Sequence, residues 1–159
     1  LSMDVTKELE GMFDNDQEII KKYSLGLISR EEIIKNTENN KQTLGSIIKK
    51  YGFPTKIKTS QKAYKSATIV TLHCGDVNFM NSFLTEMRNQ SEKDIDKADI
   101  GYLTDKINIL KKLPQIYGTQ YMKKDDKISF MPVEDIENID KRRKELGMET
   151  WEEYKKKIS

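Results

Sequence analysis

The only histidine of the chain, His73, is followed three residues later by a carboxylate, Asp76. Residues three apart share a helix face, so on a continuous helix Asp76 would hydrogen-bond the imidazole and orient it as a general acid or base. Because Ile69 and Val70 place His73 beside an apolar stripe, a partly buried histidine bonded to a backbone carbonyl is the alternative. Asp76 has its own alternative as the N-cap of a following helix, which Gly75 favours.

A second carboxylate, Asp105, has apolar helical neighbours, Tyr102 three residues before it and Ile109 four residues after it. A carboxylate in such surroundings either faces solvent at the helix edge or occupies a site at a desolvation cost. The next residue, Lys106, could form an ion pair with a carboxylate. An ordinary surface charge is the alternative for both residues.

These residues also limit the cofactors that we expect. With one histidine and one cysteine, Cys74, the chain cannot form a three-histidine metal site, an intramolecular disulfide or a multi-cysteine zinc site. No glycine-rich phosphate loop is present, and a Cys74–His73 hydrolase pair is disfavoured because adjacent helical residues diverge by about 100°. We therefore expect no cofactor, and a divalent metal at His73, Asp76 and Asp105 is the alternative.

The composition indicates a protein with a highly charged surface. Of the 159 residues 34% are charged, and the 28 basic and 26 acidic side chains are interleaved, as in "KKDDK" (123–127). Interleaved charge is typical of a solvated helix face, so we expect no nucleic-acid partner. No apolar run is long enough for a membrane span, and we expect a cytoplasmic protein with a single domain, 1–159. The first residues, "LSM" (1–3), resemble a cloning remnant before a native Met3, which leaves a removed targeting segment open.

Apolar residues recur every three or four positions over most of the chain, which predicts a mainly α helical bundle of six to seven helices. Capping boxes at Ser29–Glu32 and Thr150–Glu153 mark two helix starts, and Gly52 with Pro54 marks a helix end. The expected helices cover residues 4–23, 30 to about 50, 60–74, 77–87, 95–112, 135–146 and the stretch from 151 onward.

After the fifth helix, "IYGTQYM" and "KISFMPV" flank the turn-like "KKDDK" and predict one small β-hairpin near residues 115–132. Alternation along a strand would separate the "QIYGTQ" side chains into two faces. Gly118 would let a ligand or another backbone approach closely. The two amides of this segment, Gln115 and Gln120, either line a pocket over His73 and Asp105 or close hydrogen bonds inside a packed seam.

Five short motifs follow one another along the chain: "YGFP" (51–54), "LHCGD" (72–76), "YLTDK" (102–106), "PQIYGTQ" (114–120) and "IDKRRKELGM" (139–148). In this order they resemble a family of uncharacterised bacterial proteins, a domain of unknown function, over about residues 40–154. The resemblance implies no activity. It singles out a set of positions: Tyr51, Gly52, Pro54, His73, Asp76, Asp105, Gln115, Tyr117, Gly118, Thr119, Gln120, Asp140 and Arg143.

The chain departs from this pattern in three places. Phe53 stands where the family prefers tryptophan, and Leu72 replaces a polar residue before the histidine. Lys106 replaces an arginine, which keeps the positive charge but loses the planar fork for bidentate carboxylate recognition.

Together these observations lead us to expect a polar pocket that binds a small polar or peptide-like ligand. The predicted catalytic residues are His73, Asp76 and Asp105. The predicted ligand-binding residues are Lys106, Gln115, Tyr117, Gly118, Thr119, Gln120 and Arg143. A hydrolase or transferase with His73 as general acid/base is the first alternative, and an immunity or partner-binding protein is the second. The oligomeric state stays open.

Overall fold

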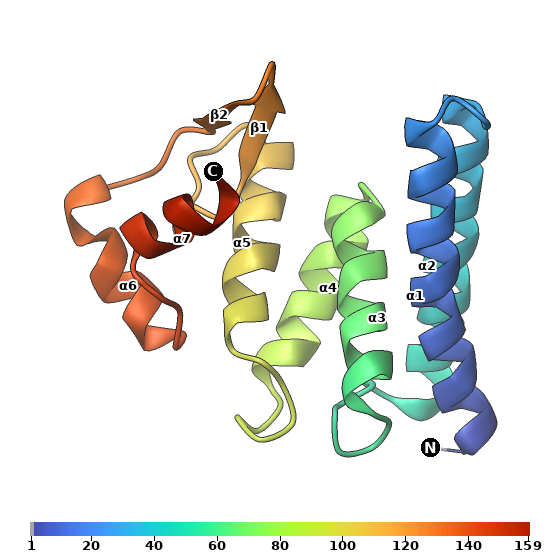
Figure 1. The fold of residues 1–159 in the computed structure, drawn as a ribbon. Helices are drawn as coiled ribbons and strands as arrows, with labels where there is room; N and C mark the ends of the chain where they lie inside the picture. The colour runs from blue at the N-terminus through green and yellow to red at the C-terminus, as the bar shows by residue number, and fades with distance from the viewer. Residues whose placement is uncertain (1) are drawn as a thin grey trace. The chain divides into compact units, whose positions relative to one another are not determined.

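The computed structural model describes residues 2–159, so Leu1 of the expected cloning remnant lies outside the described residues. Over residues 2–159 the chain forms seven α-helices, one short 3₁₀ helix and one two-stranded antiparallel hairpin (Figure 1). The predicted fold class is therefore confirmed. No helix in this part of the chain has both the length and the apolar character needed to cross a membrane.

The contacts within the chain define two compact units. The first comprises the residues up to Asp76 together with Asn89–Ile95, and the second comprises Val77–Arg88 and Asp96–Ser159. Each unit has fully buried apolar residues of its own, such as Leu9 in the first and Leu103 in the second. A single domain over 1–159 stays a prediction.

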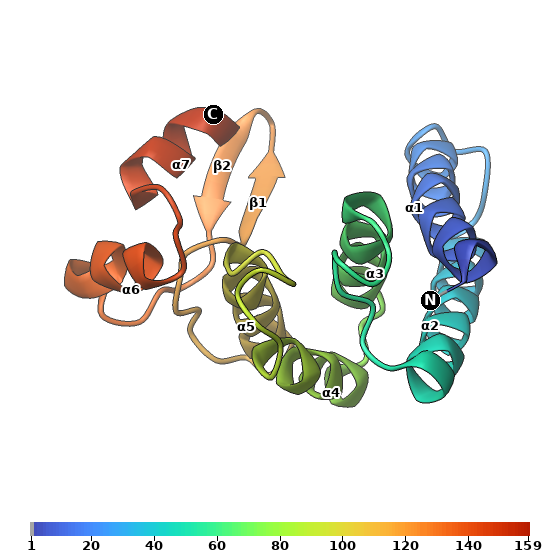
Figure 2. The same cartoon turned by 90° about the horizontal axis from the view of Figure 1, so that it is seen from below.

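The first unit contains three helices, α1 (Met3–Ser24), α2 (Arg30–Tyr51) and α3 (Gln61–His73). The long helices α1 and α2 run antiparallel beside each other (Figures 1 and 2), and α3 packs against α1. Two fully buried alanines, Ala63 and Ala67, keep the inner face of α3 small. The hydroxyl of Ser66 on that face donates to the carbonyl of Leu9. Small side chains thus let the two helices lie close together.

Helix boundaries in the first unit follow the capping signals of the sequence. The Ser29 hydroxyl accepts from the Glu32 amide at 3.1 Å, and the Glu32 carboxylate accepts from the Ser29 amide at 2.6 Å, which confirms the predicted capping box. Helix α2 ends at Tyr51, where Gly52 has a φ of 83°, a conformation that glycine adopts without strain.

The second unit begins with α4 (Val77–Arg88) and α5 (Ala98–Leu110), which pack against each other. The chain then forms β1 (Tyr121–Lys124), β2 (Lys127–Phe130), η1 (Ile136–Asn138), α6 (Ile139–Glu145) and α7 (Trp151–Ile158). Helix α7 lies beside the hairpin (Figures 1 and 2). The Phe130 ring of β2 contacts the rings of Trp151 and Tyr154 on α7 at centroid distances of 5.2 and 6.3 Å, which holds the two elements together.

The hairpin is real but shorter than the predicted range of 115–132. Its strands cover residues 121–124 and 127–130, with Tyr121 opposite Phe130. Asp125 and Asp126 form the turn with φ angles of 51° and 60°, as a tight hairpin turn requires. Residues 115–120 form no strand apart from an isolated bridge at Gln115. A strand cannot continue through this segment because Gly118 has a φ of 66°.

Candidate functional site

The imidazole of His73, the last residue of α3, is bonded to a carboxylate from α1. Its Nδ1 atom lies 3.0 and 3.2 Å from the two carboxylate oxygens of Asp16. The Asp16 side chain is 5% exposed and that of His73 is 40% exposed, so a buried carboxylate holds a ring that reaches the surface. A carboxylate on Nδ1 orients the ring and leaves Nε2 for another partner.

Asp76 does not share a continuous helix with His73. Helix α3 ends at His73, and Gly75 has a φ of 67°, a left-handed conformation that stops the helix. The Asp76 carboxylate accepts a hydrogen bond of 2.9 Å from Lys41 on α2. The condition for the expected His73–Asp76 pair is therefore not met, and Asp16 occupies the position that the sequence analysis gave to Asp76.

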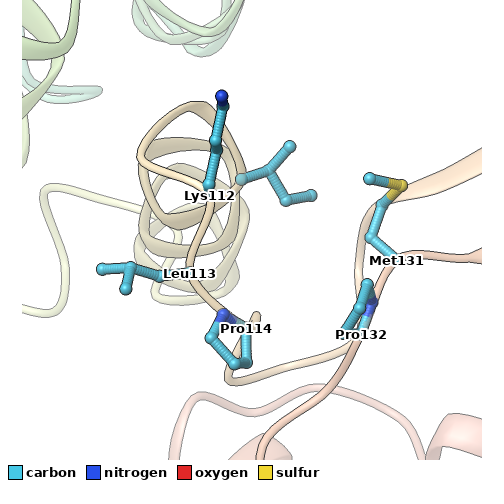
Figure 3. A pocket seen from close by; sticks show the side chains of 6 residues that line it. Lys112, Leu113, Pro114, Met131 and Pro132 are labelled. Carbon is cyan, nitrogen blue, oxygen red and sulfur yellow. The ribbon is translucent and has the colours of Figure 1, made fainter.

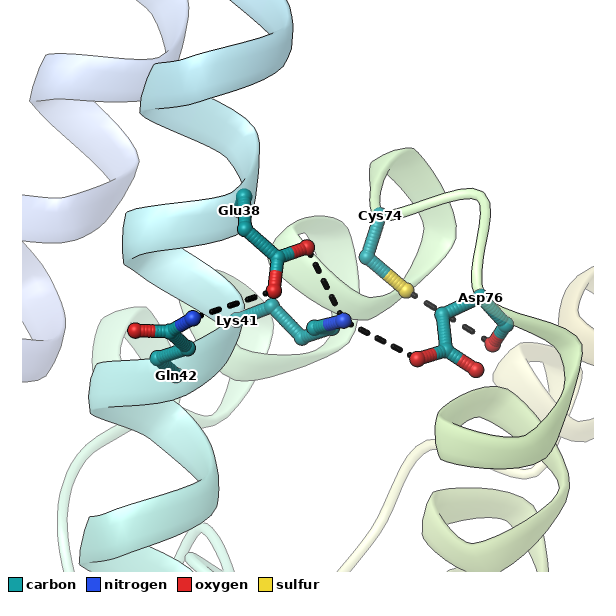
Figure 4. A network of polar contacts seen from close by, with 5 residues as sticks. All are labelled: Glu38, Lys41, Gln42, Cys74 and Asp76. Carbon is teal, nitrogen blue, oxygen red and sulfur yellow. Dashed lines mark hydrogen bonds and ion pairs between the residues drawn. The ribbon is translucent and has the colours of Figure 1, made fainter.

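Lys41 links two carboxylates in the first unit. Its ammonium lies 2.9 Å from the Glu38 carboxylate and 2.9 Å from that of Asp76 (Figure 4). The hydrogen bond to Glu38, followed by the hydrogen bond to Asp76, raises the pKa of Lys41. The hydrogen bond between Lys41 and Glu38 also lowers the pKa of Glu38. The amide of Gln42 also donates to Glu38 at 3.2 Å. The Lys41 ammonium thus forms ion pairs with both the Glu38 and the Asp76 carboxylates.

A cavity of about 310 Å³ lies beside His73 within the first unit. Its lining residues come from α2 and from the end of α3: Ile33, Ile34, Thr37, Glu38, His73, Cys74 and Gly75. Burial raises the pKa of the Cys74 thiol, and the Thr37 hydroxyl donates to the Ile33 carbonyl at 2.8 Å. Neither group is prepared as a nucleophile. The volume lies at the small end of the range for ligand pockets, so a small ligand would fit.

Asp105, on α5 in the second unit, is completely buried and accepts four hydrogen bonds. One oxygen accepts from the amides of Ile116 and Tyr117 at 2.7 and 3.0 Å. The other accepts from the amide and the hydroxyl of Thr119 at 3.0 and 2.7 Å. A carboxylate that is sealed and occupied in this way organises a loop. Its predicted catalytic role stays a prediction that this geometry does not favour.

The carbonyl groups of the same loop accept from side chains that lie later in the chain. Arg142 Nε donates to Ile116 at 2.9 Å, and Arg143 donates to Tyr117 at 2.6 Å. Trp151 Nε1 donates to the carbonyl of Gly118 at 3.0 Å, and the Tyr154 hydroxyl donates to that of Thr119 at 2.7 Å. Side chains therefore provide the donors for the backbone carbonyls of this partly buried loop, as buried carbonyls require.

The amide of Gln115 closes this loop at its base. Its side chain is fully buried. The side-chain oxygen accepts from the backbone N–H of Gln120 at 2.9 Å, and the side-chain nitrogen donates to the backbone carbonyls of Gln120 and Met131 at 3.0 and 2.8 Å. The side-chain nitrogen of Gln120 donates to the Thr119 hydroxyl at 3.1 Å. The two glutamines thus close hydrogen bonds in a packed seam, which is one of the two roles that the sequence left open.

Arg143 is the largest fully buried side chain of the described residues. Its guanidinium donates to the carbonyls of Tyr117 and Glu149 at 2.6 and 2.7 Å and lies 5.0 Å from the ring centroid of Tyr154. One terminal nitrogen, the second η atom, has no hydrogen-bond partner within residues 2–159. Stacking on the tyrosine face offsets part of the cost of burying this cation.

The predicted site residues fall into the two units. The first unit contains His73 and Asp76. The second unit contains Asp105, Lys106, Gln115, Tyr117, Gly118, Thr119, Gln120 and Arg143, all of which join the buried network or neighbour it, with Lys106 half-buried on α5. A single pocket formed by both sets stays a prediction.

The sequence analysis missed several residues of these networks, Asp16 among them. A signal for Asp16 was present, because it continues the buried stripe of α1 from Leu9 and Met12 at helical spacing. A carboxylate on the apolar stripe of a helix requires a partner. Trp151 and Tyr154 carried no comparable signal, since their acceptors are backbone carbonyls.

A second cavity, of about 300 Å³, lies in the second unit beside the end of α5 (Figure 3). Its lining is mostly apolar: Ile109, Lys112, Leu113, Pro114, Met131 and Pro132. None of the predicted site residues lines it. Within residues 2–159, no group of three or more histidine, cysteine, aspartate or glutamate side chains is arranged to hold a metal ion.

The comparisons with known proteins identify a family and no activity. A family model described as a family of unknown function (DUF6624) matches residues 4–159. This range extends beyond the residues of the sequence resemblance at both ends. No curated protein and no solved structure gives a significant match.

Proposed function

The chain belongs to the family of unknown function DUF6624, and we propose that it binds a small polar or peptide-like ligand in the cavity beside His73. The observation that carries this proposal is the contact between Asp16 and His73 at the wall of that cavity. Burying a carboxylate costs free energy. Here the buried carboxylate orients a ring that is two-fifths exposed, which is the arrangement of a binding group prepared for a partner.

The proposal assigns the ligand to the first unit alone. Asp105 and the loop 115–120 use their polar groups on one another and on side chains of the same unit. Their hydrogen bonds would have to break before a ligand could use them. His73 and Glu38 keep exposed surface and line the same cavity.

The imidazole signal of the single histidine gives a direct test by NMR. We expect glycylglycine, added at millimolar concentrations, to shift the His73 ring resonances in a saturable manner. A matched pair of variants locates the effect. Ile34→Trp fills the cavity from an exposed position in its lining, whereas Ile57→Trp adds the same ring at an exposed position of the first unit that does not line it. Loss of the shift in the first variant alone supports the proposal. An unchanged His73 signal in the native protein at every concentration would contradict it.

A second candidate function, a hydrolase or transferase with His73 as general acid/base, is favoured by the same Asp16 contact. A carboxylate on Nδ1 keeps Nε2 in the orientation in which it can take a proton from water or a hydroxyl. We expect His73→Gln to reduce hydrolysis of p-nitrophenyl acetate to the uncatalysed rate, since general-base catalysis contributes about 100-fold or more. Equal rates for the native protein and this variant would remove the enzyme candidate while leaving ligand binding intact.

A further inference from the structure

We infer that the ligand of the His73 cavity is a small organic amine with a short apolar chain, and that Asp16 is the positioning residue that prepares the imidazole to accept it. The inference rests on the proposed function, because it names the ligand class for the same cavity. Three features support it: the proton position on the ring, the balance of charge around the cavity, and the two isoleucines in its wall.

The contact with Asp16 determines which ring nitrogen carries the proton when the imidazole is neutral. Both oxygens of a carboxylate are acceptors, so Nδ1 must donate to bond with Asp16 at 3.0 Å. The other nitrogen, Nε2, then has a free lone pair and can only accept. Nε2 has no hydrogen-bond partner among the described residues. A ligand that reaches this atom therefore has to bring a hydrogen-bond donor.

The charges at the cavity favour a cation. The Glu38 carboxylate lies in its wall, and the Asp16 carboxylate bonds the wall residue His73. The Lys41 ammonium pairs with Glu38 but is shared with Asp76. Glu38 itself lines the cavity, and its oxygens each accept one hydrogen bond, which leaves acceptor capacity for a ligand. A carboxylate or phosphate ligand would meet repulsion here.

The apolar part of the wall limits the rest of the ligand. Ile33 and Ile34 line the cavity from α2, whereas His73 is the last residue of α3, and the space measures about 310 Å³. An alkyl chain of a few carbons would bury its methylene groups against the isoleucines, which is favourable because apolar surface is removed from water. We expect an ammonium group at its end to donate to Nε2 and to the Glu38 carboxylate, since both residues line the cavity.

The proton position can be read first, on the unmodified chain. Long-range ¹H–¹⁵N correlation spectra at about pH 8, above the usual titration range of histidine, contain one imidazole because the chain has one histidine. We expect the proton on Nδ1. A proton on Nε2 would overturn the inference without the use of any variant, and it would leave binding of a ligand to the cavity untouched.

The ligand class is tested with three probes of equal chain length, butylammonium, 1-butanol and butyrate, titrated at constant ionic strength against the His73 signal. We expect butylammonium to bind at least about tenfold more tightly than butyrate, a difference of about 1.4 kcal/mol, with 1-butanol between them. Equal or tighter binding of butyrate overturns the ligand class while the cavity keeps its function. No response to any probe or to glycylglycine overturns the inference and the proposed function together.

Two variants of α1 test the role of Asp16. Asp16→Asn removes the carboxylate that holds the ring, and Asp14→Asn makes the same charge change on the same helix at an exposed residue that pairs with Lys62. We expect Asp16→Asn to shift the proton toward Nε2 and to weaken butylammonium binding about tenfold or more, and Asp14→Asn to do neither. If Asp16→Asn keeps the proton on Nδ1 and the native affinity, Asp16 has no positioning role. Should that variant unfold, the proton position of the native chain and the three probes decide.

Discussion

Asp105 illustrates how one buried side chain can determine the course of a loop. Its two oxygens accept hydrogen bonds from three backbone amides and one hydroxyl, all within residues 116–119. Hydrogen bonds to a charged group are worth roughly twice those between neutral groups. Replacement of this carboxylate should therefore cost more than the loss of any single contact.

We expect Asp105→Asn to lower the free energy of unfolding by about 3 kcal/mol. The amide retains one acceptor oxygen, but its NH₂ group faces amides that also donate, which leaves buried donors without partners. Urea unfolding followed by circular dichroism measures the change. Asp126→Asn serves as the control, because Asp126 is an exposed turn residue whose positive φ asparagine also tolerates. Equal stability of the two variants would contradict the role given to Asp105.

For single residues, the sequence indicated which polar side chains form contacts in the structure, but it did not indicate which residues they contact. It identified His73, Asp105 and Arg143, which all take part in polar contacts in the structure. The partner of His73 was missed, because Asp16 lies 57 residues away and only the packing of α1 on α3 brings the two together. Hydrogen bonds from side chains to backbone carbonyls are difficult to predict from a sequence, because every residue has a backbone carbonyl.

Among the elements, the loop 115–120 is the one whose conformation depends most on its surroundings. It carries no charge of its own, yet it is surrounded by Asp105, Arg142 and Arg143. Its neutrality follows from this arrangement, because its backbone already provides the partners for those charges. A charged side chain within the loop would compete with them at a desolvation cost.

Gly118 provides a steric test of this loop. A Cβ atom at this position would lie 2.5 Å from Trp151 Nε1 and 2.8 Å from Ile139 Cδ1, and the residue has a φ of 66°. We expect Gly118→Ala to cost roughly 2 to 4 kcal/mol, from overpacking together with left-handed strain. Gly26→Ala is the matched control, since Gly26 has a φ of 70° and open space around it, so only the strain of about 1 kcal/mol remains. Similar losses for both variants would show that Trp151 does not pack against this glycine.

Helices were predictable here because their signals are local. Capping residues, apolar periodicity and positive-φ glycines lie within the elements that they define or directly beside them, and Ser29 and Gly52 both act as expected. The predicted range of the hairpin, 115–132, contains the observed strands but begins too early, because "QIYGTQ" has residues that are common in strands. Its backbone groups are taken by α5, α6 and α7, and contacts of that kind cannot be read from a local pattern.

For the whole molecule, three tyrosines that are partly or fully buried contribute to how stability depends on alkaline pH. Burial raises the pKa of Tyr102, Tyr117 and Tyr154, all in the second unit. A group whose pKa is higher in the folded than in the unfolded state stabilises the fold below its unfolded pKa, about 10 for tyrosine, and loses that contribution as the pH rises toward the folded pKa. The unfolded chain releases these protons first.

We therefore expect the free energy of unfolding to be level near neutral pH and to fall above about pH 10, by at most about 1.4 kcal/mol per pH unit for each tyrosine. Urea titrations between about pH 8 and about pH 11 measure the slope. Tyr154→Phe should reduce this slope, whereas Tyr23→Phe, at an exposed position of α1, should not. The comparison of variants is needed because the raised pKa values of Lys41 and of the Cys74 thiol contribute losses of the same sign over this pH range. An identical slope in both variants would contradict the assignment to Tyr154.

The order in which the chain is synthesised gives the loop 115–120 an unusual folding history. Its carbonyl partners are added only 26 to 35 residues after the loop itself, at Arg142, Arg143, Trp151 and Tyr154. Until they emerge from the ribosome, the carbonyls of residues 116–119 lack these donors, whereas the bonds to Asp105 and those between Gln115 and Gln120 can already form. The first unit has all its residues by Ile95 and can condense earlier. Translation itself thus separates the completion of the two units in time, and the second unit passes through a stage in which its polar backbone depends on water.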